Sequence, residues 1–172
     1  MEYFFVSHDS RLDSIGGDIL FSDRVLNGFD QANEDETAVV KSGKKLVYRS
    51  VIEHPVLLVS TEICEILKQF KPDLRYKVVV VTDPLTYENS RYGLIDIPVV
   101  DCISRTKSTI EHGIVKLAVI DENLVGDLNI FKISQFPEAG LAVRLDVAEG
   151  LLRRSLYGIR IRRIQSQRSG LK

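Results

Sequence analysis

Short runs of β-branched and aromatic residues, separated by polar or glycine-containing turns, dominate the hydrophobic pattern of the chain. The densest run, Tyr76–Val81, predicts a central strand that is buried on both faces. The alternation of isoleucine and arginine over residues 159–162 predicts a solvated edge strand with the isoleucines turned inward. Further strands are predicted at residues 3–6, 46–48, 56–59, 92–100, 114–120, 129–133 and 141–145.

Two longer helices are predicted where apolar residues recur at helical spacing. The first follows a cap at Ser60 or Thr61 and ends before Pro72, and its buried face carries Ile63, Ile66, Leu67 and Phe70. The second is capped by Asp146, with Glu149 at the capping-box position, and its buried face carries Val147, Leu151, Leu152 and Leu156.

Strand, capped helix and strand thus occur twice, at residues 56–81 and 141–164. This pattern predicts an α+β fold, in which a mixed, largely antiparallel sheet carries the helices of two duplicated strand-helix-strand units. We expect one domain over residues 1–165 and a disordered tail over residues 166–172.

The composition is that of an ordinary globular protein, with 44% hydrophobic and 27% charged residues in a chain of 172. No apolar run approaches the roughly 20 residues of a membrane-spanning helix, and the first residues lack the features of a signal peptide. We therefore expect a cytoplasmic protein with no membrane partner. Cys64 and Cys102 are too few and too far apart for a disulfide scaffold or a zinc site, and both are expected in the core.

Charge is divided unevenly along the chain. Residues 1–38 hold nine acidic and two basic residues, a net charge of −7, whereas residues 151–172 hold seven basic residues and no acid. The two ends either attract each other across the folded surface or form a patch that binds a partner. After a short helix over residues 22–29 with Ser22 as its N-cap, a mobile acidic loop is predicted over residues 30–38, carrying Asp30, Glu34, Asp35 and Glu36.

No motif predicts catalytic residues, a metal site or a cofactor, so we expect a binding protein and not an enzyme. His8, His54 and His112 lack metal-ligand spacing, and residues 7–10 only place triad residue types next to one another in sequence. The hydroxyls and bases of residues 101–108 either receive an anion or satisfy the backbone of a turn. The alternative function is a nucleic-acid-binding regulatory domain or small enzyme that uses this turn and the basic C-terminal strand, although aromatic stacking partners for nucleic acid are few.

Two segments of the chain carry a resemblance to a known family: Asp96-Ile97-Pro98-Val99-Val100-Asp101-Cys102-Ile103-Ser104-Arg105-Thr106-Lys107-Ser108 and Leu128-Asn129-Ile130-Phe131-Lys132-Ile133. Both resemble segments of bacterial polymorphic-toxin immunity proteins, a family long catalogued as a domain of unknown function. The similarity extends roughly over residues 46–164 and implies a protein that binds and neutralises a cognate secreted toxin, with no catalytic residue of its own.

If the partner is such a toxin, the acidic residues are the candidate contacts. Toxins that cut nucleic acid have basic clefts, which a mobile loop could enter as a phosphate mimic. The predicted toxin-binding residues are Asp30, Glu34, Asp35 and Glu36.

Overall fold

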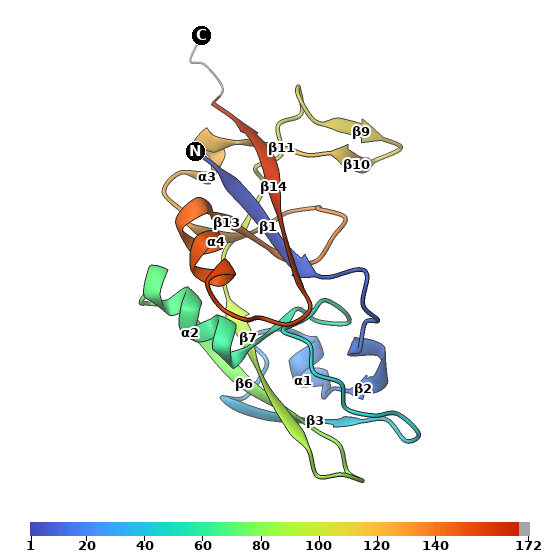
Figure 1. The fold of residues 1–172 in the computed structure, drawn as a ribbon. Helices are drawn as coiled ribbons and strands as arrows, with labels where there is room; N and C mark the ends of the chain where they lie inside the picture. The colour runs from blue at the N-terminus through green and yellow to red at the C-terminus, as the bar shows by residue number, and fades with distance from the viewer. Residues whose placement is uncertain (169–172) are drawn as a thin grey trace.

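The computed structural model describes residues 1–168, which form two six-stranded sheets, one above the other in Figure 1, and a separate two-stranded hairpin. The upper sheet has the order β11 (Val119–Asp121), β14 (Ile159–Gln167), β1 (Tyr3–His8), β13 (Leu141–Arg144), β12 (Ile130–Ile133) and β8 (Val99–Val100). The lower sheet has the order β2 (Ile19–Leu20), β3 (Asp35–Val40), β6 (Arg75–Thr82), β7 (Asn89–Asp96), β5 (Leu58–Ser60) and β4 (Val51–Ile52). The hairpin is β9 (Thr109–Glu111) and β10 (Ile114–Leu117), and it projects from the upper half.

Helices are short and few compared with strands, which confirms the predicted α+β class. They are the 3-10 helix η1 (Gly16–Asp18), α1 (Asp23–Leu26), α2 (Thr61–Phe70), α3 (Glu122–Val125) and α4 (Leu145–Leu152). Most strand pairs are antiparallel, as predicted, but β3 pairs with β6, β8 with β12, and β11 with β14 in parallel. The prediction of one sheet is wrong, because these strands form two.

The two sheets share one local arrangement. In the lower sheet, β5 and β6 lie on either side of β7 and antiparallel to it, and α2 connects them. In the upper sheet, β13 and β14 lie on either side of β1 and antiparallel to it, and α4 connects them. The helices contact each other where Gly150 of α4 lies against the Phe70 ring of α2, so close that a Cβ on Gly150 would be 2.7 Å from it.

Three groups of buried side chains stabilise these layers. The central core joins α2 and α4 to both sheets, the lower core packs the other face of the lower sheet against α1, and the upper core packs the other face of the upper sheet against α3. The caps of α1 and α2 are as predicted: the hydroxyl of Ser22 accepts from the N–H of Val25, and the hydroxyl of Ser60 accepts from the N–H of Ile63.

Several local predictions in the second unit are wrong. Helix α4 begins two residues earlier than expected, with Arg144 as its N-cap and no side-chain cap bond, and Asp146 accepts only from the N–H of Val147. Leu152 is 65% exposed, whereas Leu151 is buried. Leu152 is the last residue of the helix and lies five positions after Val147, more than one turn of 3.6 residues, so it points away from the face that Val147 and Leu151 share.

Other differences concern strands. Residues 46–48 form no strand, and within β6 only Val79 and Val81 are buried, because this sheet is covered unequally on its two faces. Strand β14 is an edge strand only in part, since β11 pairs with residues 165–167. The predicted disordered tail is wrong for Ser166 and Gln167, which belong to β14, and residues 169–172 lie outside the described part of the chain.

Candidate functional site

Strand β3 occupies most of the segment that was predicted to be a mobile acidic loop. It starts at Asp35, and its side chains alternate between exposed positions at Asp35, Thr37 and Val39 and buried positions between them. The strand pairs with β6 along one side, but β2 pairs only with its residues 39 and 40 on the other. Among the described residues, the first part of β3 therefore has a free backbone edge.

Glu36 does not lie in a mobile loop, so this part of the prediction is wrong. Its side chain is 4% exposed and points toward the lower core side of the strand. The N–H of Asn33 donates to its carboxylate at 2.8 Å, and Arg24 and Ser22 donate from α1 and its cap. The Asn33 hydrogen bond, followed by Arg24 and Ser22, lowers the pKa of Glu36 against the opposing effect of burial. Glu36 thus fixes α1 to β3.

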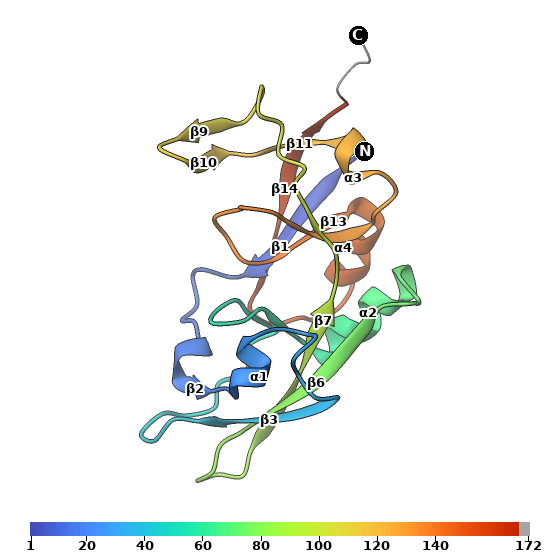
Figure 2. The same cartoon turned by 180° about the vertical axis from the view of Figure 1, so that it is seen from behind.

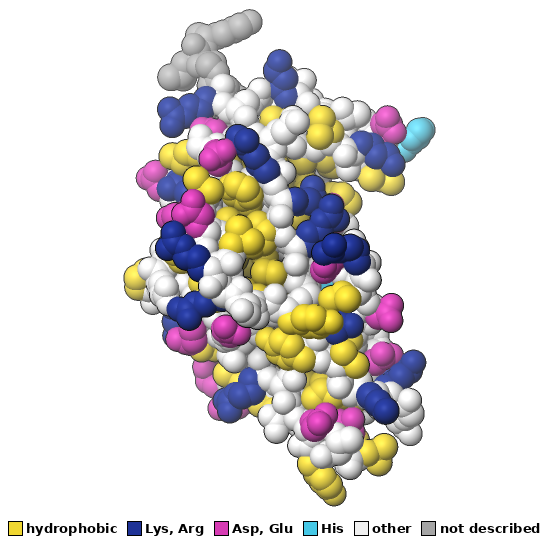
Figure 3. Space-filling view, in the orientation of Figure 1, with side chains coloured by type: hydrophobic (Ala, Val, Ile, Leu, Met, Phe, Trp, Pro, Cys, Tyr) yellow, Lys and Arg dark blue, Asp and Glu magenta, His cyan; other side chains and the backbone are white. Residues whose placement is uncertain are grey.

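Asp30, Glu34 and Asp35 are exposed, and none of the ion pairs found among residues 1–168 includes them. Asp30 and Glu34 line a pocket of about 390 Å³ that also has Lys68, Arg75 and Lys77 in its wall. Those cations already have contacts: Lys77 donates to two carbonyl oxygens, Arg75 pairs with Asp96, and Lys68 lies over the Tyr76 ring. The carboxylates remain the groups available to a partner. On the face of the molecule drawn in Figure 3, acidic and basic side chains are also interspersed.

A strip of the lower sheet next to these carboxylates is not covered by a helix. Helix α2 covers Tyr76 and Gly93, and a Cβ on Gly93 would lie 2.2 Å from the Sγ atom of Cys64. The register of the strands places Val78 and Val80 on this same face, beyond the helix and only half-buried, and Val39 of β3 is 42% exposed. We call Asp30, Glu34, Asp35 and these three valines the acidic face. Sequence reasoning found its carboxylates and missed its valines, because β-branched residues in a central strand predict burial.

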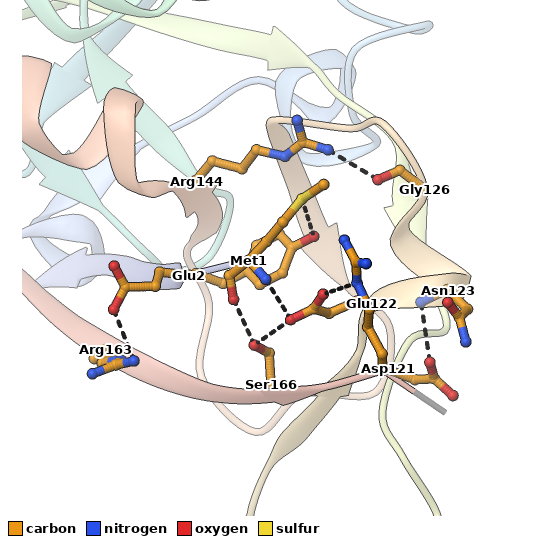
Figure 4. Close-up of polar contacts among 11 residues, drawn as sticks. Met1, Glu2, Asp121, Glu122, Asn123, Gly126, Arg144, Arg163 and Ser166 are labelled. Atoms are coloured by element: carbon orange, nitrogen blue, oxygen red, sulfur yellow. Dashed lines mark hydrogen bonds and ion pairs between the residues drawn. The ribbon is translucent and has the colours of Figure 1, made fainter. Parts of the chain in front are cut away.

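The two oppositely charged ends of the chain do not neutralise each other. Of the ion pairs described, only the one between Glu2 and Arg163 joins the acidic first segment to the basic last segment (Figure 4). The same close-up shows Glu122 of α3 accepting from the α-amino group of Met1 at 2.7 Å and from the hydroxyl of Ser166 at 2.9 Å. These bonds hold β1, α3 and the end of β14 together, which explains why the end of β14 is ordered.

The basic strand and the turn over residues 101–108 serve structural contacts. Arg162 pairs with Glu138 and lies over the rings of Phe5 and Phe136. In the turn, the Ser108 hydroxyl accepts from the N–H of Val119 and the Ser104 hydroxyl accepts from the Gln167 amide. The interpretation that the hydroxyls satisfy backbone groups is confirmed for Ser108, whereas the Ser104 hydroxyl bonds to side chains.

The remaining candidate residues lie in the fold as follows. Cys64 and Cys102 are free and buried, as predicted, and burial raises the pKa of Cys64 to about 12 and of Cys102 to about 11.

Asp9 is held by the Arg11 guanidinium, which lowers its pKa to about 2, and His8 Nε2 lies 2.9 Å from the Leu12 carbonyl oxygen. Residues 7–10 therefore do not form a nucleophile-base pair.

Within residues 1–168, no cluster of three or more histidine, cysteine or acidic residues is arranged to hold a metal ion. None of the helices in that same range is long and apolar enough to cross a membrane. No protein-family model matches the chain, and no curated protein matches it either.

Proposed function

We propose that this chain is an immunity protein that binds a cognate secreted bacterial toxin and neutralises it by direct contact in the cytoplasm. The observation that carries the proposal is the acidic face, where carboxylates without an ion pair among the described residues border Val78 and Val80, half-buried on β6, and Val39, exposed on β3. The resemblance of residues 46–164 to polymorphic-toxin immunity proteins supports it independently.

The acidic face has the properties that a toxin contact requires. The valines supply apolar area at the centre, and the carboxylates at the border supply charge that speeds association with a basic cleft. A strand fixed in the lower sheet loses less conformational freedom on binding than a mobile loop does, which favours tight association. Asp30, Glu34 and Asp35 are the proposed toxin-binding residues, and Glu36 is withdrawn from this set because it is buried.

The test uses the toxin encoded by the neighbouring gene. The triple variant Asp30→Asn, Glu34→Gln, Asp35→Asn should slow association by roughly tenfold at low salt, and the difference should shrink as salt is raised. The melting temperature should change little, because none of the three carboxylates has an ion pair to lose. Surface plasmon resonance at two ionic strengths measures the effect.

A matched control removes the same charge from the upper half with Asp101→Asn, Glu111→Gln and Asp127→Asn, all of which are exposed. If both triple variants slow association equally, only net charge matters and the acidic face is not the contact. If the wild-type chain rescues cells from the toxin without forming a detectable complex, direct neutralisation is wrong.

We also propose that the two units built around α2 and α4 are copies of one ancestral strand-helix-strand segment. The support is their shared arrangement, in which two parallel strands lie on either side of an antiparallel third strand. Superposing β7 on β1 tests the idea: copies place α2 and α4 on the same face of the superposed strands, and opposite faces would reject it.

A further inference from the structure

Lys132 is the one charged residue of β12, and the alternation of this strand turns it toward the same side as Ile130, a member of the central core. Its side chain is half-buried, and no hydrogen bond or ion pair to it is found among residues 1–168. Burial lowers its pKa, although the charge of Asp96 opposes this. Its Nζ atom still reaches solvent, because the buried side-chain nitrogens and oxygens without a hydrogen-bond partner among residues 1–168 are only His8 Nδ1 and Arg144 Nε, so the ammonium is accessible to a ligand that enters from solution.

Lys77 shows how this fold normally accommodates such a side chain. It is also half-buried, but its Nζ atom donates to the carbonyl oxygens of Phe29 and Ala32, both at 2.6 Å, and lies over the Phe29 ring. Lys132 has no equivalent contacts. The two lysines are therefore similarly buried, but only the ammonium group of Lys77 has hydrogen-bond partners among the described residues.

Lys132 lines a pocket of about 350 Å³ at the junction of the two sheets. One wall is the connection between β4 and β5, with His54 and Leu57, and the other is the connection between β12 and β13, with Phe136. Figure 2 draws the backbone of these two connections, in teal and orange, at the junction of the two sheets. The volume of this pocket lies in the range of small-molecule sites, and its wall combines apolar side chains with Lys132, His54 and two carboxylates.

The two carboxylates of the pocket do not pair with Lys132. Glu53 accepts from the backbone N–H of His8 at 2.8 Å, and Glu138 forms its ion pair with Arg162. Asp96, whose charge also acts on Lys132, pairs with Arg75, so an anion that enters the pocket would find an ammonium that is hydrogen-bonded to none of these carboxylates.

We propose that this junction pocket binds a small molecule with a carboxylate or phosphate group on an apolar body, and that Lys132 receives the anionic group. The leucine, prolines and phenylalanine of the lining would contact the apolar body. This site is separate from the acidic face and does not depend on toxin binding.

The experiment titrates the purified chain with benzoate, phenyl phosphate and the neutral analogue benzamide, followed by NMR chemical shifts and calorimetry. We expect benzoate or phenyl phosphate to bind at least tenfold more tightly than benzamide, and the stronger of the two identifies the anionic group. Lys132→Met should abolish the preference for the anion, and Lys132→Arg should retain it. Lys132→Met should change the melting temperature little, since the ammonium reaches solvent and has no hydrogen bond or ion pair to lose among the described residues.

Lys77→Met is the matched control, and it should lower the melting temperature without changing anion binding. The proposal is overturned if no anion binds, if Lys132→Met binds the anion like the wild type, or if Lys132→Met lowers the melting temperature or prevents folding. Either of the last two results would make the ammonium a structural group. Loss of toxin binding in Lys132→Met without any anion binding would assign the lysine to a protein contact instead.

Discussion

The α2 unit and the α4 unit reach the same arrangement of strands by different routes. In the α2 unit, β5, α2, β6 and β7 follow one another along the chain, between residues 58 and 96. In the α4 unit, β13, α4 and β14 are consecutive, but the strand between β13 and β14 is β1, from the opposite end of the chain. The arrangement is thus a property of packing, and chain continuity is not required for it.

The largest test of this comparison concerns the buried face of α4. Leu151→Ala should lower the free energy of unfolding by about 2–5 kcal/mol, because Leu151 is fully buried in the central core. Leu152→Ala should change it by less than about 0.5 kcal/mol, because that side chain is exposed. Urea denaturation of both variants measures the difference. Equal losses would mean that α4 is rotated relative to the structure described.

The second test concerns how closely each helix approaches its sheet. Helix α2 lies against Gly93, whereas β1 turns Val6 toward the central core beside α4. Gly93→Ala should lower the free energy of unfolding by about 1–3 kcal/mol, since the new methyl group collides with the Cys64 side chain. Adding Cys64→Ala to Gly93→Ala should recover part of this loss, and a double-mutant cycle by denaturation measures the coupling. Strictly additive losses would show that Cys64 does not limit the approach.

The smallest expected difference lies in the helix caps. Ser60→Ala should lower the free energy of unfolding by about 1 kcal/mol, because it removes the hydroxyl that accepts a hydrogen bond from the backbone N–H of Ile63. Asp146→Ala should lower the free energy of unfolding by roughly 0.5 kcal/mol. The Asp146 carboxylate is not the N-cap, and it stabilises α4 only through its charge in the first turn and its bond to the N–H of Val147. Thermal unfolding of the two variants checks the order, and a larger loss at Asp146 would contradict the assigned N-cap.

Local pattern was sufficient for the parts of the fold that depend on neighbouring residues. Ser60 and the apolar spacing of Ile63, Ile66 and Leu67 predicted α2 with its cap and its buried face, and these predictions are confirmed. The same reasoning wrongly placed Leu152 in the core, because adjacent residues of a helix point in different directions and only Leu151 shares the buried face of Val147.

Tertiary contacts decided the rest. The acidic composition of residues 30–38 predicted a loop, yet pairing with β6 and the buried bonds of Glu36 make residues 35–38 part of a strand. The pocket around Lys132 joins residues that are far apart in sequence, and no spacing rule could have brought them together. The proposed toxin-binding role of Asp30, Glu34 and Asp35 stays a prediction.

The position of β1 has a consequence for protein synthesis. Strand β1 is translated before both of its partners, β13 and β14. The α2 unit, whose contacts are local, should acquire protection from hydrogen exchange before these two strands are made, and β1 should acquire it only once they have emerged from the ribosome. Until then the apolar residues of β1 are available to molecular chaperones, so the step most exposed to aggregation in the cell is the pairing of β1 with β13 and β14.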